Sequence, residues 1–161
     1  MKVYLAGPMR GYDNYNFQEF EQGASYLAWL GHEVVSPHEI DIQEGYVHAK
    51  FHYIPAYASF IPHVRRFSSV NLTSKFDIQT VLQRDIREVT QCDAIGFLVG
   101  SDDSVGARHE AYVASVCGLT FFEVVPWIYF AETGKSDQMK LAAEIQADYW
   151  SNHSMWAEGS F

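Results

Sequence analysis

The sequence predicts one α/β domain with a doubly wound, mostly parallel sheet and Rossmann- or flavodoxin-like layering. The main observation is that short apolar runs, typical of buried strands, alternate with longer segments of helical periodicity. The second is that 161 residues, 48% of them apolar, suffice for one buried core but not for two ordinary domains. We therefore expect residues 1–161 to form a single domain.

Four apolar segments have the length and composition of buried strands, and they cover residues 3–6, 32–36, 94–99 and 119–125. The first is stopped by Gly7-Pro8 and the second by Pro37, and both are turn signals. Between the strands, apolar residues recur at three- and four-residue spacing over residues 16–30, over residues 77–91 and from about Ala107 onward. These three segments are predicted to be helices, the first of them ending at Gly31.

Two parts of the chain depart from this alternation. Residues 41–76 fit neither period, are rich in Tyr, Phe and His, and are long for a plain loop, so we expect an aromatic-rich insertion or lid there. Residues 126–161 form a C-terminal extension with a helical patch over residues 139–150 and a polar, aromatic tail.

The net charge of the chain limits the classes of partner that it can bind. A formal net charge of −9 and a pI near 5.1 disfavour a nucleic acid polymer, because binding to phosphate backbones depends on a basic patch. Small charged ligands are compatible with this composition.

Two cysteines, Cys92 and Cys117, have neither the number nor the spacing of a disulfide framework or a thiolate metal site. We expect both to be buried apolar residues in a cytoplasmic protein. The most apolar later segment is interrupted by Glu123 and Pro126, so no membrane span is predicted.

Glu110 is a carboxylate on a helix face that should be buried. It shares that face with Ala114 and Cys117, at i+4 and i+7. Burying a charge costs several kcal/mol unless it is paired. Glu110 is therefore either satisfied by a cap or a salt bridge or placed for a ligand.

Asp85 has the same peculiarity. On the helix over residues 77–91 it shares a face with Ile78, Leu82 and Val89, whereas Arg84 and its charged neighbours are expected to reach solvent. The same two explanations apply to Asp85.

Two loops should meet near these carboxylates, because ligands of doubly wound folds bind beyond the carboxyl ends of the strands. Residues 104–107, SVGA, offer a hydroxyl, a glycine and helix N-terminal amides, which favour an anion. Residues 7–11, GPMRG, bring Arg10 to the same edge as a phosphate or carboxylate partner. The alternatives are an ordinary N-cap at Ser104 and a simple tight turn.

Three stretches of the chain carry more specific patterns: YLAGPMRGYDNYNFQEFEQGASYLAWLGHEVVSP, RDIREVTQCDAIGFL and SVGARHEAYVASVCGL. In this order and spacing, over roughly residues 3–40 and 77–125, the sequence resembles the nucleoside 2-deoxyribosyltransferase-like family. That family includes 2′-deoxynucleoside 5′-monophosphate N-glycosidases and many phage-encoded relatives. The resemblance implies the family's fold, a homodimer or larger homo-oligomer, and the host cytoplasm if the chain is phage-encoded.

The resemblance also implies catalytic roles for Glu110, Asp85 and Tyr4. Glu110 matches the nucleophile that attacks the anomeric carbon, Asp85 an aspartate associated with proton transfer, and Tyr4 a tyrosine that orients the nucleophile. Departure of a nucleobase creates oxocarbenium character, which a carboxylate stabilises and traps while an acid protonates the base. We expect the helix dipole to keep Glu110 ionised, and Asp85 to need a raised pKa.

The substrate-binding residues implied by the resemblance are Gly7, Met9, Arg10, Ser104 and Gly106. Ser104 stands six residues before Glu110, where the monophosphate hydrolases carry a serine for the 5′-phosphate and the transferases an aspartate for the sugar. Arg10 matches an arginine of the hydrolases' phosphate loop. We therefore expect cleavage of a 2′-deoxynucleoside 5′-monophosphate, or of a deoxynucleoside, with release of the base to water.

The alternative within the family is a transferase that moves deoxyribose between bases. Pro8 replaces a phosphate-binding serine of the hydrolases, Asp102 or Asp103 could supply the sugar-binding carboxylate, and the ending AEGSF is similar to the tail of some transferases. The aromatic residues 46–67 are expected either to control base stacking and the acceptor or to serve as a packing element or subunit contact.

Other classes of function fit less well. A non-catalytic nucleotide-binding or sensor module would use Glu110 for ribose hydroxyls, and the joint presence of Glu110, Asp85 and Tyr4 favours the enzyme. A metal site at His48, His52 and His63 is disfavoured because the segment is not clearly helical. No G-x-G-x-x-G follows the first strand, which disfavours a dehydrogenase. We expect neither a metal nor a cofactor.

Overall fold

The computed structural model of the protein describes residues 1–54 and 64–124. The chain begins with β1 (Lys2–Ala6), the short 3-10 helix η1 (Asp13–Asn16), α1 (Phe17–Trp29), β2 (Glu33–Val35) and α2 (Pro37–Gln43). It continues with β3 (Val47–Ile54), β4 (Val64–Leu72), α3 (Ile78–Val89), β5 (Ala94–Phe97), η2 (Ser101–Asp103), α4 (Val105–Val116) and β6 (Thr120–Glu123). All four predicted strands and the three predicted helices within the described residues are present.

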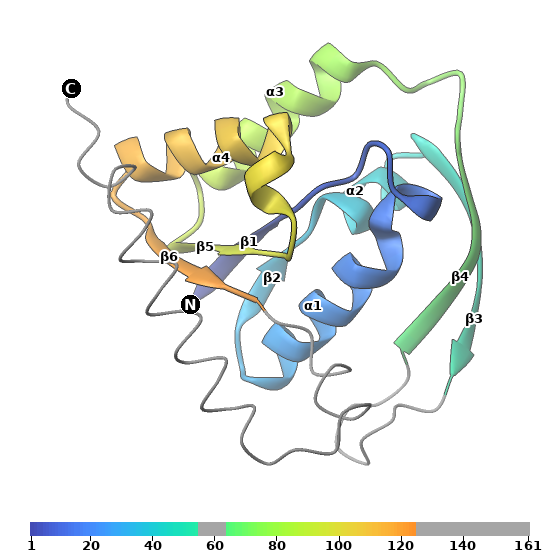
Figure 1. The fold of residues 1–161 in the computed structure, drawn as a ribbon, viewed down its shortest axis with the longest axis horizontal. Coiled ribbons are helices and arrows are strands. Elements are labelled where there is room, and N and C mark those ends of the chain that lie inside the picture. The colour runs from blue at the N-terminus through green and yellow to red at the C-terminus, as the bar shows by residue number, and fades with distance from the viewer. Residues whose placement is uncertain (55–63, 125–161) are drawn as a thin grey trace.

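The main sheet is parallel and four-stranded, in the order β2-β1-β5-β6. Helix α1 covers one face of this sheet, whereas α3 and α4 cover the other (Figure 1). Alternate residues of β1 divide between the two cores, with Val3 and Leu5 toward α1 and Tyr4 and Ala6 toward α3 and α4. This arrangement confirms the predicted doubly wound α/β fold.

The buried face of α3 differs in part from the predicted one. Ile78 and Leu82 are 47% and 37% exposed, while the buried positions are Val81, Asp85 and Val89. The first turns of α3 extend past the end of the sheet, so apolar residues there have no strand to cover them (Figure 1). The inward orientation predicted for Asp85 is nevertheless confirmed.

Residues 41–76, where we expect an aromatic-rich insertion or lid, contain regular secondary structure in the part that the structure describes. Strands β3 and β4 form an antiparallel hairpin that is a separate two-stranded sheet. The alternation of Val47, Ala49 and Phe51 with polar residues is a signal for a strand that this prediction overlooked. Helix α2 was also missed, although Ser36-Pro37-His38-Glu39 combines a capping-box pattern with proline at the first helical position.

The hairpin packs against the side of the domain and curves around α1 and α2 (Figure 1). Phe17 of α1 forms a buried cluster with Val47, Phe67 and Val70 from the inner face of the hairpin. The side chain of Gln18 extends the contact, because it accepts a hydrogen bond from the Phe67 amide at 3.1 Å and donates one to the Arg65 carbonyl at 3.0 Å. The hairpin is thus fixed to α1 by apolar and polar contacts.

One expectation about the cysteines is wrong. Cys92 is buried as expected, but Cys117 is exposed, because α4 ends at Val116 and the chain turns away at Gly118 with φ of 72°. The predicted helical patch over residues 139–150 and the C-terminal tail lie outside the described residues. Within residues 1–54 and 64–124, no helix has the length and apolar character needed to cross a membrane.

Candidate active site

Tyr4 and Glu110 form the centre of the candidate site. The Tyr4 hydroxyl donates a hydrogen bond of 2.8 Å to Oε1 of Glu110, and the two residues are 0% and 6% exposed. Helix α4 packs Ala107 and Ala114 onto the core above β1 and β5, so Glu110, which lies between them on the same face, points at the sheet. The predicted inward orientation of Glu110 and its predicted partner Tyr4 are both found.

Asp85 approaches the same region from α3 and is 7% exposed. Its Oδ1 accepts hydrogen bonds from Nε and Nη2 of Arg84, at 2.9 and 2.6 Å. The expectation that Arg84 reaches solvent is wrong: its side chain is only 10% exposed, and its Nη1 donates to Asp41 of α2 at 2.7 Å. The ring of Tyr46 lies 5.8 Å from the guanidinium, which is therefore held on several sides.

The two buried carboxyl groups have raised pKa values. Burial raises the pKa of Glu110 to about 8, and the nearby charge of Asp85 adds to this effect. Burial also raises the pKa of Asp85 to about 6, against the opposing charge of Arg84. The expectation that the helix dipole keeps Glu110 ionised is wrong, because loss of hydration outweighs a helix terminus. Between these two values the pair holds about one proton.

Tyr4 remains a neutral phenol over the physiological range. Its burial, together with the charges of Glu110 and Asp85, raises its pKa well above the usual value. A neutral hydroxyl can donate a hydrogen bond to Glu110 but cannot take a proton from a substrate at neutral pH. Tyr4 is therefore suited to orienting Glu110.

The loops after β1 and β5 meet at one edge of the sheet, as predicted. A Cβ placed on Gly100 would lie 2.6 Å from the Tyr12 hydroxyl and 3.3 Å from Pro8, so the two loops are in direct contact there. The Ser101 hydroxyl also donates a hydrogen bond to the carbonyl of Ala6, at 3.4 Å. The candidate phosphate loop therefore borders the start of the segment that leads into α4.

Of the residues predicted in the first loop, Arg10 is accessible to a ligand. It is exposed and makes no ion pair with any residue of the two described segments. Gly7 and Met9 pack against the core, and their predicted contact with a substrate stays a prediction. A Cβ on Gly7 would lie 2.9 Å from Cδ1 of Leu98, and Met9 packs against two of the hydrophobic clusters.

The second loop shows both features expected of it. Ser104 caps α4, and its hydroxyl accepts a hydrogen bond from the Ala107 amide at 3.2 Å. The N-cap explanation of Ser104 is thus correct, while the hydroxyl keeps capacity for a second partner. A Cβ on Gly106 would meet only the Ser104 oxygen, at 3.9 Å, so the backbone there is open to an incoming group.

His48 and His52 cannot bind one metal ion together. His48 and His52 lie on strand β3, where a separation of four residues corresponds to about 13 Å. His63 lies outside the described residues. A different group, formed by Glu21, His38 and Glu39, has potential ligand atoms within 4.8 Å of one another.

That group is already neutralised by an arginine. Arg65 donates to Oε1 and Oε2 of Glu21 at 3.0 and 2.6 Å and also pairs with Glu39. On the other side, His38 lies 3.1 Å from Glu21 and 2.6 Å from the hydroxyl of Ser36. A divalent cation would have to displace the guanidinium, so we interpret the group as a buried ion-pair network.

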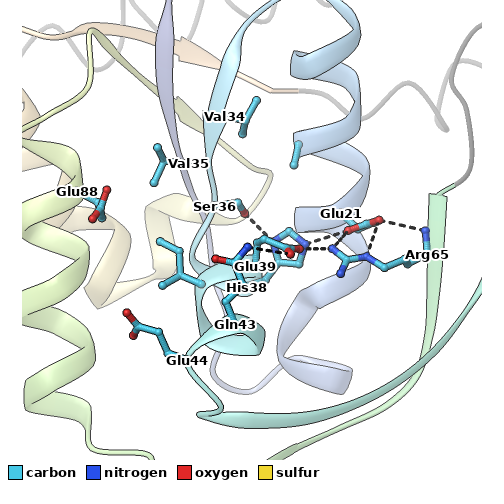
Figure 2. A pocket seen from close by; sticks show the side chains of 12 residues that line it. Glu21, Val34, Val35, Ser36, His38, Glu39, Gln43, Glu44, Arg65 and Glu88 are labelled. Carbon is cyan, nitrogen blue, oxygen red and sulfur yellow. Dashed lines mark hydrogen bonds and ion pairs between the residues drawn. The ribbon is translucent and has the colours of Figure 1, made fainter.

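This network lines a cavity of about 430 Å³ beside β2. Figure 2 shows the side chains of Glu21, His38, Glu39 and Arg65 meeting on one side of it. None of the predicted site residues lines this cavity. It is therefore separate from the centre formed by Tyr4, Glu110 and Asp85.

Comparison with known proteins gives the following relations. The family described as "Domain of unknown function (DUF4406)" matches residues 1–64 and 46–123 of the chain. Among solved structures, a 2-deoxyribosyltransferase from the psychrotolerant bacterium Bacillus psychrosaccharolyticus is 17% identical, with a TM-score of 0.48 over 76% of this chain and 71% of that one. No curated protein matches the chain. None of these comparisons assigns an activity to this protein.

Proposed function

The protein belongs to the family described as "Domain of unknown function (DUF4406)", and we propose that it cleaves the N-glycosidic bond of a deoxynucleotide or deoxynucleoside. The observation that carries this proposal is the buried carboxyl pair of Glu110 and Asp85, with the neutral Tyr4 donating to Glu110. A carboxyl pair that holds one proton can supply the nucleophile and the acid that this reaction needs. The reactive arrangement, with the proton on Asp85, is the minor one, because the higher pKa of Glu110 places the proton mostly on Glu110. The resemblance to the nucleoside 2-deoxyribosyltransferase-like family supports the same assignment.

In the first step, an oxygen of ionised Glu110 attacks C1′ of the sugar. The C1′–N bond breaks, its electron pair leaves with the base, and the proton held by Asp85 goes to the base. The product is a glycosyl ester of Glu110. Tyr4 holds Oε1 of Glu110, which leaves the other carboxylate oxygen available for the attack.

In the second step, Asp85, now ionised, takes a proton from the acceptor. With water as the acceptor, the oxygen attacks C1′, the ester bond breaks, and Glu110 leaves as a carboxylate. The pair then holds one proton again, and the sugar carries a hydroxyl at C1′. With a second base as the acceptor, the same intermediate would give a new nucleoside, so a transferase uses the same residues.

A 5′-monophosphate is the substrate we favour, because exposed Arg10 belongs to a loop that contacts Gly100, which begins the loop leading to the Ser104 hydroxyl and the open backbone at Gly106. An exposed arginine and a helix N-terminus both favour an anion. Ser104 has a second role as the cap of α4, which a test of phosphate binding must separate from binding itself.

Two variants of Ser104 separate these roles. Ser104→Ala removes both functions, and losing the cap should cost about 1 kcal/mol of unfolding free energy. Ser104→Asp keeps the cap and places a negative charge beside the phosphate. We expect Ser104→Asp to lower kcat/KM for a deoxynucleoside 5′-monophosphate at least tenfold, with little change for the deoxynucleoside, as measured by base release.

Arg10→Ala should give the same selective loss without affecting the cap. An equal loss on nucleotide and nucleoside in both variants would contradict a phosphate site. Product analysis by chromatography with and without a free acceptor base then identifies the acceptor. Free base formed without an acceptor shows hydrolysis, and a new nucleoside shows transfer.

A non-catalytic nucleotide-binding module remains the alternative class. It predicts binding without turnover for every deoxynucleoside and monophosphate tested. The raised pKa values of Glu110 and Asp85 favour the enzyme, because a carboxyl group that only accepts hydrogen bonds from ribose works best ionised.

A further inference from the structure

The hairpin formed by β3 and β4 differs from the rest of the chain in charge. Residues 45–76 contain none of the 20 Asp and Glu residues of the protein but four of its 11 Lys and Arg residues, together with three of its seven histidines. All the acidic charge behind the net value of −9 therefore lies outside this segment. A basic element on an acidic protein indicates an anionic partner for that element.

Two of these four basic residues, Lys50 and Arg66, lie on the outer face of the hairpin with two histidines, whereas Arg65 pairs with Glu21 and Glu39. His48, Lys50 and His52 alternate along β3 with the residues that face α1, and all three are exposed. Arg66 on β4 is exposed and lies directly opposite His52 in the pairing register. The remaining opposite positions, Ser69 and Asn71, are polar and uncharged. The face therefore offers donors and positive charge with no carboxylate among them.

Aromatic rings lie on the other face of the same strand. Phe51 and Tyr53 are 39% and 63% exposed, and their ring centroids are 5.8 Å apart in an edge-to-face arrangement. These rings face away from the basic side chains, and the Phe51 ring packs against Phe67 and Arg65, so the outer face would act on a nucleic acid through charge and hydrogen bonds and not through stacking. The spacing of alternate strand residues, about 6.7 Å, allows successive side chains to reach successive phosphates.

The inner face of the hairpin contacts the loop that carries Arg10. This face packs on Phe17, and the same cluster includes Met9 of that loop. Asn14, which follows that loop, accepts a hydrogen bond from the Val70 amide at 3.2 Å. DNA bound to the outer face would thus be held by a hairpin whose opposite face contacts the proposed phosphate loop.

We propose that the outer face of the hairpin binds the phosphodiester backbone of single-stranded DNA, and that the substrate is a nucleotide within or at the end of such a strand. The second half of this proposal rests on the proposed function, and the first does not. A second copy of this chain is the competing partner, because its acidic surface would also be attracted to the hairpin.

The test measures binding of a fluorescein-labelled 20-residue oligo(dT) to the full-length chain by anisotropy, at several salt concentrations. The Glu110→Gln variant is used, so that binding is observed without turnover. The charge-reversed variant Lys50→Glu/Arg66→Glu is compared with a matched control, Arg87→Glu/Arg108→Glu, which makes the same change on exposed residues of α3 and α4.

We expect the hairpin variant to bind at least tenfold more weakly, while the control changes less than threefold. Loss of two phosphate contacts should also reduce the slope of log K against log salt by about 1.4. Equal weakening by both variants would overturn the proposal, as would absence of binding at low salt. If the chain does not bind DNA, but the hairpin variant differs from the wild type in oligomeric mass, the face binds a second copy of the chain instead.

The proposed glycosidase activity and the proposed DNA-binding face can be disproved separately. If oligo(dT) binds through the hairpin but no base is released from any nucleotide, the binding face stands and the glycosidase does not. If mononucleotides are cleaved and oligo(dT) is not bound, the glycosidase stands and the substrate class proposed here is wrong.

Discussion

Glu110 is the residue at which folding stability and the proposed chemistry oppose each other. Its pKa is about 8 in the folded protein and near 4.5 in an unfolded chain, because burial disfavours the charged form. The folded state therefore binds the proton more tightly, so the contribution of Glu110 to stability is complete below about pH 4.5. That contribution is lost as the pH rises toward 8.

Glu110→Gln should consequently stabilise the protein at alkaline pH. The amide cannot ionise, so the variant should exceed the wild type in unfolding free energy at pH 8 by on the order of 4 kcal/mol. At pH 5 the two proteins should differ little. Urea denaturation at both pH values measures this, and a variant that is less stable at both would show that Glu110 is a structural residue.

The shared proton also sets the expected pH dependence of activity. The reactive form has Glu110 ionised and Asp85 protonated, which is the minor arrangement of the singly protonated pair because Glu110 has the higher pKa. We expect kcat/KM to rise with pH near 6, where the doubly protonated pair loses a proton. It should fall near 8, where the pair becomes fully ionised.

Arg84 determines where the acid limb of that profile lies. Its charge lowers the pKa of Asp85, so Arg84→Met should move the acid limb upward, whereas Arg84→Lys should move it less. The profile of initial base-release rates against pH measures the shift. A variant that loses activity with an unchanged profile would indicate that Arg84 serves only the fold.

Among the secondary-structure elements, the hairpin depends most on one residue. Arg65 of β4 connects it to Glu21 of α1 and to Glu39 of α2. Burial works to raise the pKa of Glu21, but hydrogen bonds from His38 and Arg65 outweigh it and lower the pKa to about 2. The stability that this carboxylate provides is present above about pH 4.5 and is lost as the pH falls toward 2.

Arg65→Met should therefore loosen the hairpin before the rest of the fold. The variant leaves a buried carboxylate without its partner, which costs about 3–5 kcal/mol. Amide hydrogen exchange should accelerate in β3 and β4 more than in β1 and β5. Uniform acceleration in all four strands would show that the hairpin and the main sheet unfold as one unit.

The success of prediction from sequence differed between elements for physical reasons. The strands of the main sheet are buried on both faces, so each is a continuous apolar run that stands out. The strands of the hairpin are covered on one face only, and their alternation was hidden among aromatic and histidine residues such as Phe51 and His52. Helix α2 has seven residues, which is too short for its periodicity to be distinct.

Helical spacing placed Glu110 and Asp85 inward, because the face of a residue is a local property of the helix. The partners of Arg84 could not be predicted in the same way. Asp41 lies 43 positions away in sequence, and nothing local connects it to Arg84. The same limit applies to the network of Glu21, His38 and Arg65, which joins three elements through contacts distant in sequence.

For the whole molecule, the net charge conceals an uneven distribution. The expectation that excludes a nucleic acid polymer uses the average of −9, whereas the hairpin segment carries only basic residues among its charged side chains. The resemblance also implies a homo-oligomer and a cytoplasmic location, and both remain predictions. The apolar residues Ile78 and Leu82, exposed on α3, are where we would first look for a subunit contact.

The most direct test of the central claim is the initial rate of base release from the best deoxynucleotide or deoxynucleoside substrate, measured at pH 7 for the wild type and for Glu110→Gln. We expect the variant to be folded and at least as stable as the wild type, and to lose about a thousandfold or more in rate, roughly 4 kcal/mol of transition-state stabilisation. A folded Glu110→Gln variant that keeps most of the activity would contradict the assignment of the buried carboxyl pair as the reactive centre.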